Sequence, residues 1–128
     1  MVTLSNKRPV YLNLLKIRLP LAGMVSLAHR VSGVLLFLAI PFAVYLLHLS
    51  TMSASGFDEA LKLFDNTLIK LINTALLWSI AHHFFTGIRF LLIDADIGVD
   101  KQAANFSAKL VVFLELVIIL SLLCWVWR

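Results

Sequence analysis

Three long stretches of this chain are almost free of charge, and they restrict its fold more than any other feature. Residues 31–57, 71–88 and 110–127 together contain one charged side chain, that of Glu115. A helix crosses the roughly 30 Å hydrocarbon core of a bilayer with about 20 apolar residues, each adding about 1.5 Å. The pattern therefore predicts an all-α membrane protein with three transmembrane helices, over about 21–49, 62–92 and 106–127.

The composition agrees with a membrane location. Hydrophobic residues make up 61% of the 128 residues and charged residues 14%, against roughly 45–50% and about 25% in soluble domains. The single cysteine, Cys124, excludes an intrachain disulfide and a thiolate metal cluster built by this chain alone. Lys and Arg flank the apolar stretches rather than following one face, which argues against nucleic-acid binding. The length predicts a single domain, residues 1–128.

Local signals predict where the first two helices end and begin. Pro41 lies inside the first helix and is expected to kink it, because it removes one backbone donor. Residues 50–56 have the composition of a turn, and Ser55 or Asp58 would cap the helix that follows. The amphipathic stretch 57–69 is expected to extend the second helix on the outer side.

The distribution of Lys and Arg predicts the orientation of the helices. Basic residues are concentrated before the first helix and around the second loop, at Lys7, Arg8, Lys16, Arg18, Arg89, Lys101 and Lys109. By the positive-inside rule, the N-terminal segment 1–20 and the second loop lie in the cytoplasm and the C-terminus in the periplasm. No secretory signal or organelle transit peptide is recognisable, so we expect a complete chain of a bacterial inner membrane.

The first helix contains a polar cluster near its cytoplasmic end. Ser26 and Arg30 are four residues apart and share one face, and His29 and Gly33 share the neighbouring face. A hydroxyl, an imidazole and a guanidinium in this arrangement can hydrogen-bond a carbonyl or pair with a carboxylate. The alternative is that Arg30 snorkels to the headgroups and His29 sits in the interface.

The second helix contains a candidate haem ligand. His83 lies inside the apolar stretch, where a neutral imidazole is a good axial ligand for haem iron. Gly87, one turn later, would let a flat porphyrin approach the backbone, and Arg89 would lie near the interface, where haem propionates project. In the alternative interpretation His83 is a packed histidine bonded to a neighbouring helix.

The chain does not offer a good second axial ligand. His82 points about 100° away from His83 on a helix, His48 lies near the outer end of the first helix, and His29 lies at propionate height. A ligand from a second subunit is therefore implied. Glu115, in the third helix, is interpreted as a snorkelling or partner-paired carboxylate rather than a proton relay.

Taken together, four motifs resemble one known family over nearly the whole chain. They are Arg8-Pro9, Ile17-Arg18-Leu19-Pro20, Ser26-Leu27-Ala28-His29-Arg30-Val31-Ser32-Gly33, and His83 followed by Gly87-Ile88-Arg89 and Asp94. In order and spacing they are similar to the cytochrome b-type membrane-anchor subunit of succinate dehydrogenase, respiratory complex II. One position departs from the pattern: Phe90 stands where enterobacterial members have a histidine.

The resemblance implies specific roles for these residues. His83 would be an axial ligand of a haem b shared with a second, smaller anchor subunit that supplies the other histidine. Ser26 and Arg30 would line the ubiquinone site beneath the iron–sulfur subunit, and His29 and Arg30 would lie near the haem propionates. A flavoprotein subunit would oxidise succinate, as in the tricarboxylic acid cycle, and the iron–sulfur subunit would pass the electrons to ubiquinone. This chain would have no dehydrogenase active site of its own.

Two other functions compete with this one. The first is the anchor of a fumarate reductase, which works in the opposite direction and in some cases lacks haem. The second is a small transporter or scaffold subunit in which His82, His83 and Arg30 line a substrate or proton path. The second alternative predicts function without soluble partners and without a cofactor.

Labelling of introduced cysteines tests the predicted orientation. In a Cys124→Ala background, Ser55→Cys should react with a membrane-impermeant maleimide in intact spheroplasts, because the first loop faces outward. Val99→Cys, in the second loop, should react only after permeabilisation. The reverse pattern would contradict the orientation derived from the basic residues.

Overall fold

The computed structural model describes residues 17–126, with side chains as far as Cys124. This part of the chain is all-α, with four helices: α1 (Leu21–Met52), α2 (Ala54–Leu63), α3 (Thr67–Asp94) and α4 (Lys101–Val126). Three of these helices are long and apolar enough to cross a membrane: α1, α3 and α4 each contain an 18-residue stretch of high mean hydropathy, with values of 2.1, 1.4 and 2.4. The prediction of an all-α membrane protein with three spans is confirmed, and the chain is a multi-pass membrane protein.

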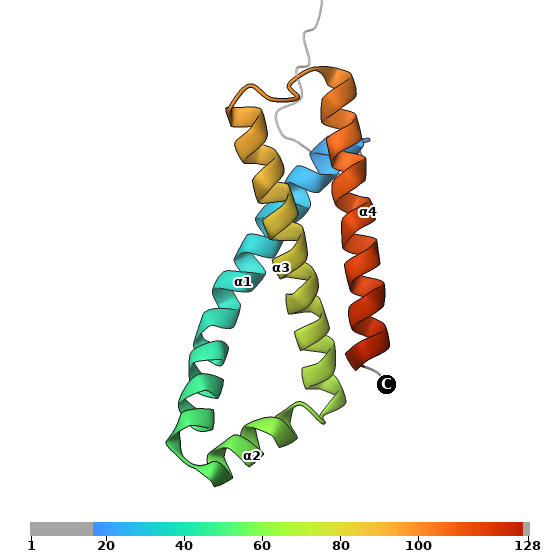
Figure 1. Cartoon of the computed structure of the whole chain (residues 1–128). Helices are drawn as coiled ribbons and strands as arrows, with labels where there is room; N and C mark the ends of the chain where they lie inside the picture. Colours follow the sequence, from blue (N-terminus) through green and yellow to red (C-terminus); the bar gives the residue numbers. More distant parts are fainter. Residues whose placement is uncertain (1–16, 127–128) are drawn as a thin grey trace, which may run out of the picture.

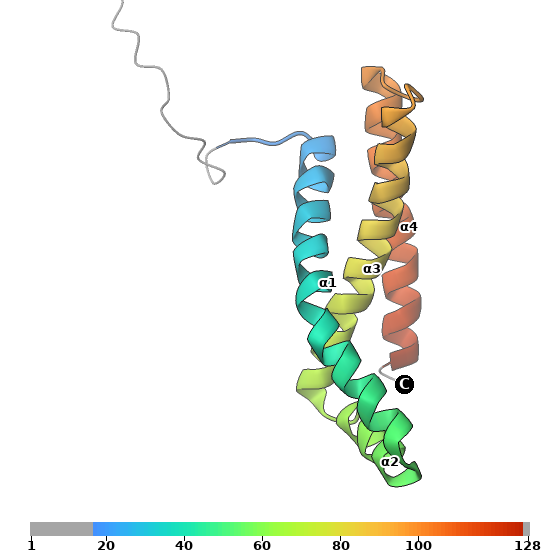
Figure 2. The same cartoon turned by 90° about the vertical axis from the view of Figure 1, so that its left-hand side faces the viewer.

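The long helices α1 and α4 both pack against α3 (Figure 1). The start of α1 and the α3–α4 loop lie at one end of the molecule, and α2 lies at the other (Figures 1 and 2). Beyond its first half, α1 diverges from α3 and runs towards α2. An apolar cavity of about 320 Å³ lies between α1 and α3. The ribbon of α1 bends along its length (Figure 2), as expected for a helix that contains Pro41.

The helix contacts are formed by small and polar side chains. Buried apolar residues are few and mostly small, and the buried polar residues are Ser32, Ser79, His82, Thr86, Arg89 and Glu115. Many large apolar side chains, among them Phe37 and Leu91, are exposed on the outside of the bundle. This distribution is typical of transmembrane helices, since lipid solvates large apolar groups and small residues let the backbones approach closely.

The junction of α1 and α2 is shorter than predicted. The hydroxyls of Ser50 and Thr51 bond to the carbonyl of Leu47 at 3.0 and 2.8 Å, so the helix continues through the expected turn to Met52. Ser53 alone is extended, and its hydroxyl accepts a hydrogen bond from the Gly56 amide at 3.0 Å. The prediction that Ser55 or Asp58 caps the next helix was therefore wrong, because Ser53 already satisfies that role.

The second predicted helix divides into two. The amphipathic stretch does not extend the membrane-spanning helix, because α2 ends at Leu63 and α3 begins at Thr67. Asn66 separates them: its side-chain oxygen accepts from the amides of Leu68 and Ile69 at 2.8 and 3.4 Å and caps α3. The expected start of this helix at residue 62 is therefore corrected to 67, and its end lies at Asp94 instead of 92.

The α3–α4 loop is shorter than the charge pattern indicated. Asp96 and Gly98 have positive φ values of 60° and 72°, which turn the chain sharply. The carboxylate of Asp100 accepts from the amides of Gln102 and Ala103, both at 2.9 Å. This cap starts α4 at Lys101, five residues before the predicted start at 106.

The close junction of α1 and α2 makes Gly56 sensitive to substitution. A Cβ atom at this position would collide with the backbone carbonyl oxygen of Leu49. Gly56→Ala should therefore destabilise the protein by about 1–3 kcal/mol, measured as a lower thermal unfolding temperature in detergent. Gly23→Ala is the matched control, since its Cβ would meet Pro20 at an ordinary distance of 3.5 Å. Equal unfolding temperatures for the two variants would contradict the close junction.

Candidate functional site where the three spanning helices meet

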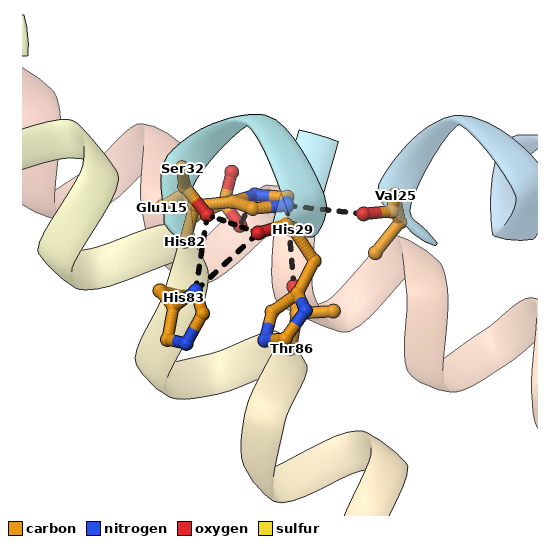
Figure 3. A network of polar contacts seen from close by, with 7 residues as sticks. All are labelled: Val25, His29, Ser32, His82, His83, Thr86 and Glu115. Carbon is orange, nitrogen blue, oxygen red and sulfur yellow. Dashed lines mark hydrogen bonds and ion pairs between the residues drawn. The ribbon is translucent and has the colours of Figure 1, made fainter. Parts of the chain in front are cut away.

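A polar network joins α1, α3 and α4 near the first half of α1 (Figure 3). Two adjacent histidines of α3 lie in it and point to different partners, as expected for consecutive residues on a helix. Within this network, the hydrogen bonds of His83 go to α1, whereas His82 contacts both α1 and α4. The chemistry available to each ring follows from the partners of its two nitrogens.

The first ring nitrogen of His83 is fixed by α1. Its Nδ1 atom lies 3.3 Å from the backbone carbonyl oxygen of His29 and 3.3 Å from the hydroxyl of Ser32. The Ser32 hydroxyl donates to the same carbonyl at 2.8 Å. Since a carbonyl accepts and cannot donate, the hydrogen lies on Nδ1 of His83, which donates to the carbonyl of His29.

The second ring nitrogen of His83 is left with its lone pair. Figure 3 shows this nitrogen pointing away from the network, and the hydrogen bonds of His83 to other described residues all involve Nδ1. An imidazole whose Nδ1–H is held by a backbone carbonyl presents Nε2 as an acceptor or a metal ligand. The geometry of α1 and α3 thus gives His83 the tautomer that metal binding requires.

His29 packs directly against His83. The two rings are stacked, with centroids 4.0 Å apart and planes 13° from parallel, and the edge of Phe90 meets His29 at 5.1 Å. The Nε2 atom of His29 is buried without a hydrogen-bond partner among the described residues. Such an atom is expected to find a polar partner in the assembled protein.

Two glycines lie at the contact between α1 and α3. A Cβ on Gly87 would lie 3.7 Å from Nε2 of His29, so the imidazole occupies the space in which a porphyrin was expected beside this glycine. A Cβ on Gly33 would lie 3.1 Å from Cε1 of His83. Gly33 on α1, rather than Gly87 on α3, is therefore the glycine that makes room for the His83 ring.

His82 is engaged at both ring nitrogens. Its Nε2 lies 3.1 Å from the carbonyl oxygen of Val25 and 3.4 Å from the Thr86 hydroxyl, and its Nδ1 lies 2.6 Å from Oε1 of Glu115 on α4. The exposed fractions of His82 and Glu115 are 2% and 6%. Of the two interpretations of Glu115, pairing is therefore the correct one, with His82 of the same chain as the partner.

Arg89 points away from His83. It is buried, its Nε donates to the Ser107 hydroxyl at 3.0 Å, and one terminal nitrogen donates to the carbonyl of Ala104 at 3.1 Å. The structure does not support the expectation that this guanidinium lies where haem propionates project, because six residues of helix turn it to the α4 side of α3 and α4 accepts its hydrogen bonds. Asp94, five residues further along the chain, is exposed on the surface.

Ser26 and Arg30 lie on α1 to one side of the histidine contact. Ser26 is half-buried, and Arg30 is exposed and lines a shallow cavity of about 240 Å³. His48 is exposed near the far end of α1. The structure thus brings His29 and His83 together. Ser26 and Arg30, which are one turn apart on α1, form a separate polar face.

Sequence reasoning missed the contacts of Ser32 and Gly33 with α3 and the pairing of His82 with Glu115. Ser32 and Gly33 stood in the polar string of α1, but their contact with α3 depends on how the helices cross. The pairing of His82 with Glu115 also had a signal, because Glu115 is the single charged residue of the third apolar stretch. A buried carboxylate requires a partner, and the neighbouring helix offers a histidine.

Comparisons with known proteins identify similar chains. The family described as "Succinate dehydrogenase/Fumarate reductase transmembrane subunit" matches residues 5–122. A succinate dehydrogenase cytochrome b556 subunit of Coxiella burnetii is 35% identical over 125 residues, covering 97% of this chain and 100% of the relative. The subunit of the same name from Rickettsia felis is 32% identical, covering 94% and 93%, and that from Paracoccus denitrificans is 29% identical, covering 80% and 78%.

Proposed function

The chain belongs to the succinate dehydrogenase/fumarate reductase transmembrane-subunit family as a cytochrome b-type anchor, and we propose that it binds haem b and helps to form a ubiquinone-reduction site. The observation that supports this function best is the difference between the two adjacent histidines. Both nitrogens of His82 are engaged by protein groups, whereas His83 keeps the lone pair of Nε2. Of the two, His83 is the residue suited to bind iron.

The residues around His83 fit a haem. The bond from Nδ1–H to the His29 carbonyl fixes the ring orientation and makes the imidazole a stronger ligand. When bound, the haem supplies a one-electron carrier in the membrane. Among the described residues of this chain, His83 is the one histidine suited to ligate iron, so a second, smaller anchor subunit would supply the other histidine.

His29 and Arg30 are suited to hold the propionates of this haem. The buried Nε2 atom of His29 lacks a partner among the described residues and would donate to a carboxylate. The guanidinium of Arg30 is exposed on the next residue of the same helix. Of the two propionates of a haem, one would satisfy the imidazole of His29 and the other would neutralise the charge of Arg30.

Ser26 and Arg30 are suited to bind a quinone. They stand one turn apart on α1, and both supply donors: a hydroxyl and a guanidinium. When a quinone is reduced, negative charge develops on its carbonyl oxygen, and donors already in place stabilise that charge. This chain would thus position ubiquinone at the cytoplasmic end of the bundle in a bacterial inner membrane.

The remaining steps belong to other subunits of the complex. A flavoprotein subunit oxidises succinate, and an iron–sulfur subunit passes the electrons to the quinone bound at this anchor. Relatives across most of the chain are named as succinate dehydrogenase subunits, which favours this direction over fumarate reduction. The family match over residues 5–122 argues against an unrelated transporter or scaffold subunit.

Replacement of His83 tests the haem assignment. The complex, extracted through a tag on this chain, should give a b-type α-band in the dithionite-reduced minus oxidised spectrum. In His83→Ala this band should weaken or shift, because the iron loses its ligand from α3. His48→Ala, which changes an exposed histidine far from the contact, is the control and should keep the wild-type band. A haem-free wild-type complex with the same partner subunits would overturn the role of His83.

Replacement of Arg30 tests the quinone assignment. A hydrogen bond to a charged group contributes about 1.5–3 kcal/mol, so Arg30→Met should lower kcat/KM for ubiquinone about 10- to 100-fold. Ser26→Ala should have a smaller effect in the same direction. Succinate oxidation with a soluble artificial electron acceptor should be unchanged, since that acceptor bypasses the membrane site. Lys62→Met removes an exposed cation from α2 and serves as the control; an equal loss in this variant would contradict the assignment.

A further inference from the structure

The two histidines of α3 are held by successive turns of α1. His82 contacts the carbonyl oxygen of Val25 at 3.1 Å, and His83 contacts that of His29 at 3.3 Å. Val25 and His29 are four residues apart, so the two carbonyls lie one above the other on the same face. The imidazoles therefore join α3 to α1 at two levels, and a rotation of α3 about its axis would break both contacts.

On the opposite side, α4 holds His82 in place. Its Nδ1 atom lies 2.6 Å from Oε1 of Glu115. Neither of these two buried atoms has a hydrogen-bond partner elsewhere in the described part of the chain. Separating the pair would leave an unpartnered polar group on both helices inside the apolar bundle, which is strongly unfavourable. The pair therefore fixes the position of His82 between α1 and α4.

The pair lies within a tightly packed contact. Thr86, one turn after His82, is fully buried and its hydroxyl lies 3.4 Å from Nε2 of His82. Trp78, one turn before, stacks on the His82 ring with centroids 5.4 Å apart. The ring therefore cannot turn independently of α3, and a displacement of His82 is transmitted to the helix.

We propose that Glu115 is a positioning residue for the haem site, which acts through His82 to fix the rotation of α3 and the direction of His83. His83 follows His82 directly, so both share the same backbone segment. At a helix radius of about 6 Å, a rotation of roughly 10° moves a side chain by about 1 Å. A shift of that size changes the angle at which Nε2 meets an iron atom. This inference rests on the proposed haem-binding function.

The position of Glu115 agrees with such a role. It is the one charged residue in the stretch 110–127, where a carboxylate is costly unless it is paired. Its neighbour Leu116 is 54% exposed and points away from the helix contact. The carboxylate thus lies on the side of α4 that faces His82.

Three substitutions in the assembled complex test the proposal. Glu115→Leu removes the partner of Nδ1, Glu115→Gln keeps a side chain of equal length that can bond to it, and Glu115→Asp withdraws the carboxylate by one methylene group. The readouts are the α-band and the electron paramagnetic resonance g values of the oxidised haem, which report the orientation of the axial ligands. We expect altered g values in Glu115→Leu and Glu115→Asp, and wild-type values in Glu115→Gln. Leu116→Ala is the matched control on the same helix and should leave the spectra unchanged.

The outcomes separate this proposal from the proposed function. A complex that contains haem and responds to His83→Ala, but keeps wild-type g values in Glu115→Asp, would overturn the positioning role alone. A lower unfolding temperature in Glu115→Leu with unchanged g values would also overturn it, since the pair would then be merely structural. If Glu115→Leu does not assemble, the comparison of Glu115→Asp with Glu115→Gln decides. Absence of haem from the wild-type complex would overturn the proposed function itself.

Discussion

The fold depends on one constraint: a polar group inside a bilayer must find its partner within the protein. The large apolar side chains of this chain face outward, where lipid solvates them equally well in many arrangements. They therefore do not specify how the helices meet. The polar side chains do, because Arg89 has its donors satisfied only against α4, and His82 only between Val25 and Glu115. Many arrangements of the helices would bury a similar amount of apolar surface, and the few buried polar contacts select one of them.

The same constraint explains how far the sequence predicted the fold. Charge-free stretches long enough to cross a membrane identify the spans, because the cost of burying a charge in lipid applies whatever the tertiary structure. The ends of the helices were less predictable. Ser53, Asn66 and Asp100 each cap a helix by accepting backbone amides, and many other Ser, Asn and Asp residues nearby had equal potential to do so. Which one becomes the cap depends on the path of the chain between helices.

The site was predictable in part for a similar reason. A helical pattern gives the angle between two residues of one helix, so His82 and His83 were correctly separated. It does not give the rotation of one helix against another. Gly87 was expected to make room for a porphyrin, but His29 of α1 lies against it, and Arg89 was expected near haem propionates but bonds to α4. Both differences concern contacts between helices, whereas the residues themselves were identified from the sequence.

The adjacency of His82 and His83 divides two tasks between neighbouring residues. A histidine that joins three helices uses both ring nitrogens, so it has none left for a metal, whereas a metal ligand must keep one nitrogen free. Here His82 uses both nitrogens to join α1, α3 and α4, and His83 uses one for α1 and keeps the other. The angle of about 100° between them prevents each from taking the other's partners. The packing of the bundle and the direction of the proposed ligand are therefore set by the same segment of α3, so any change that repacks the helices at His82 also redirects His83.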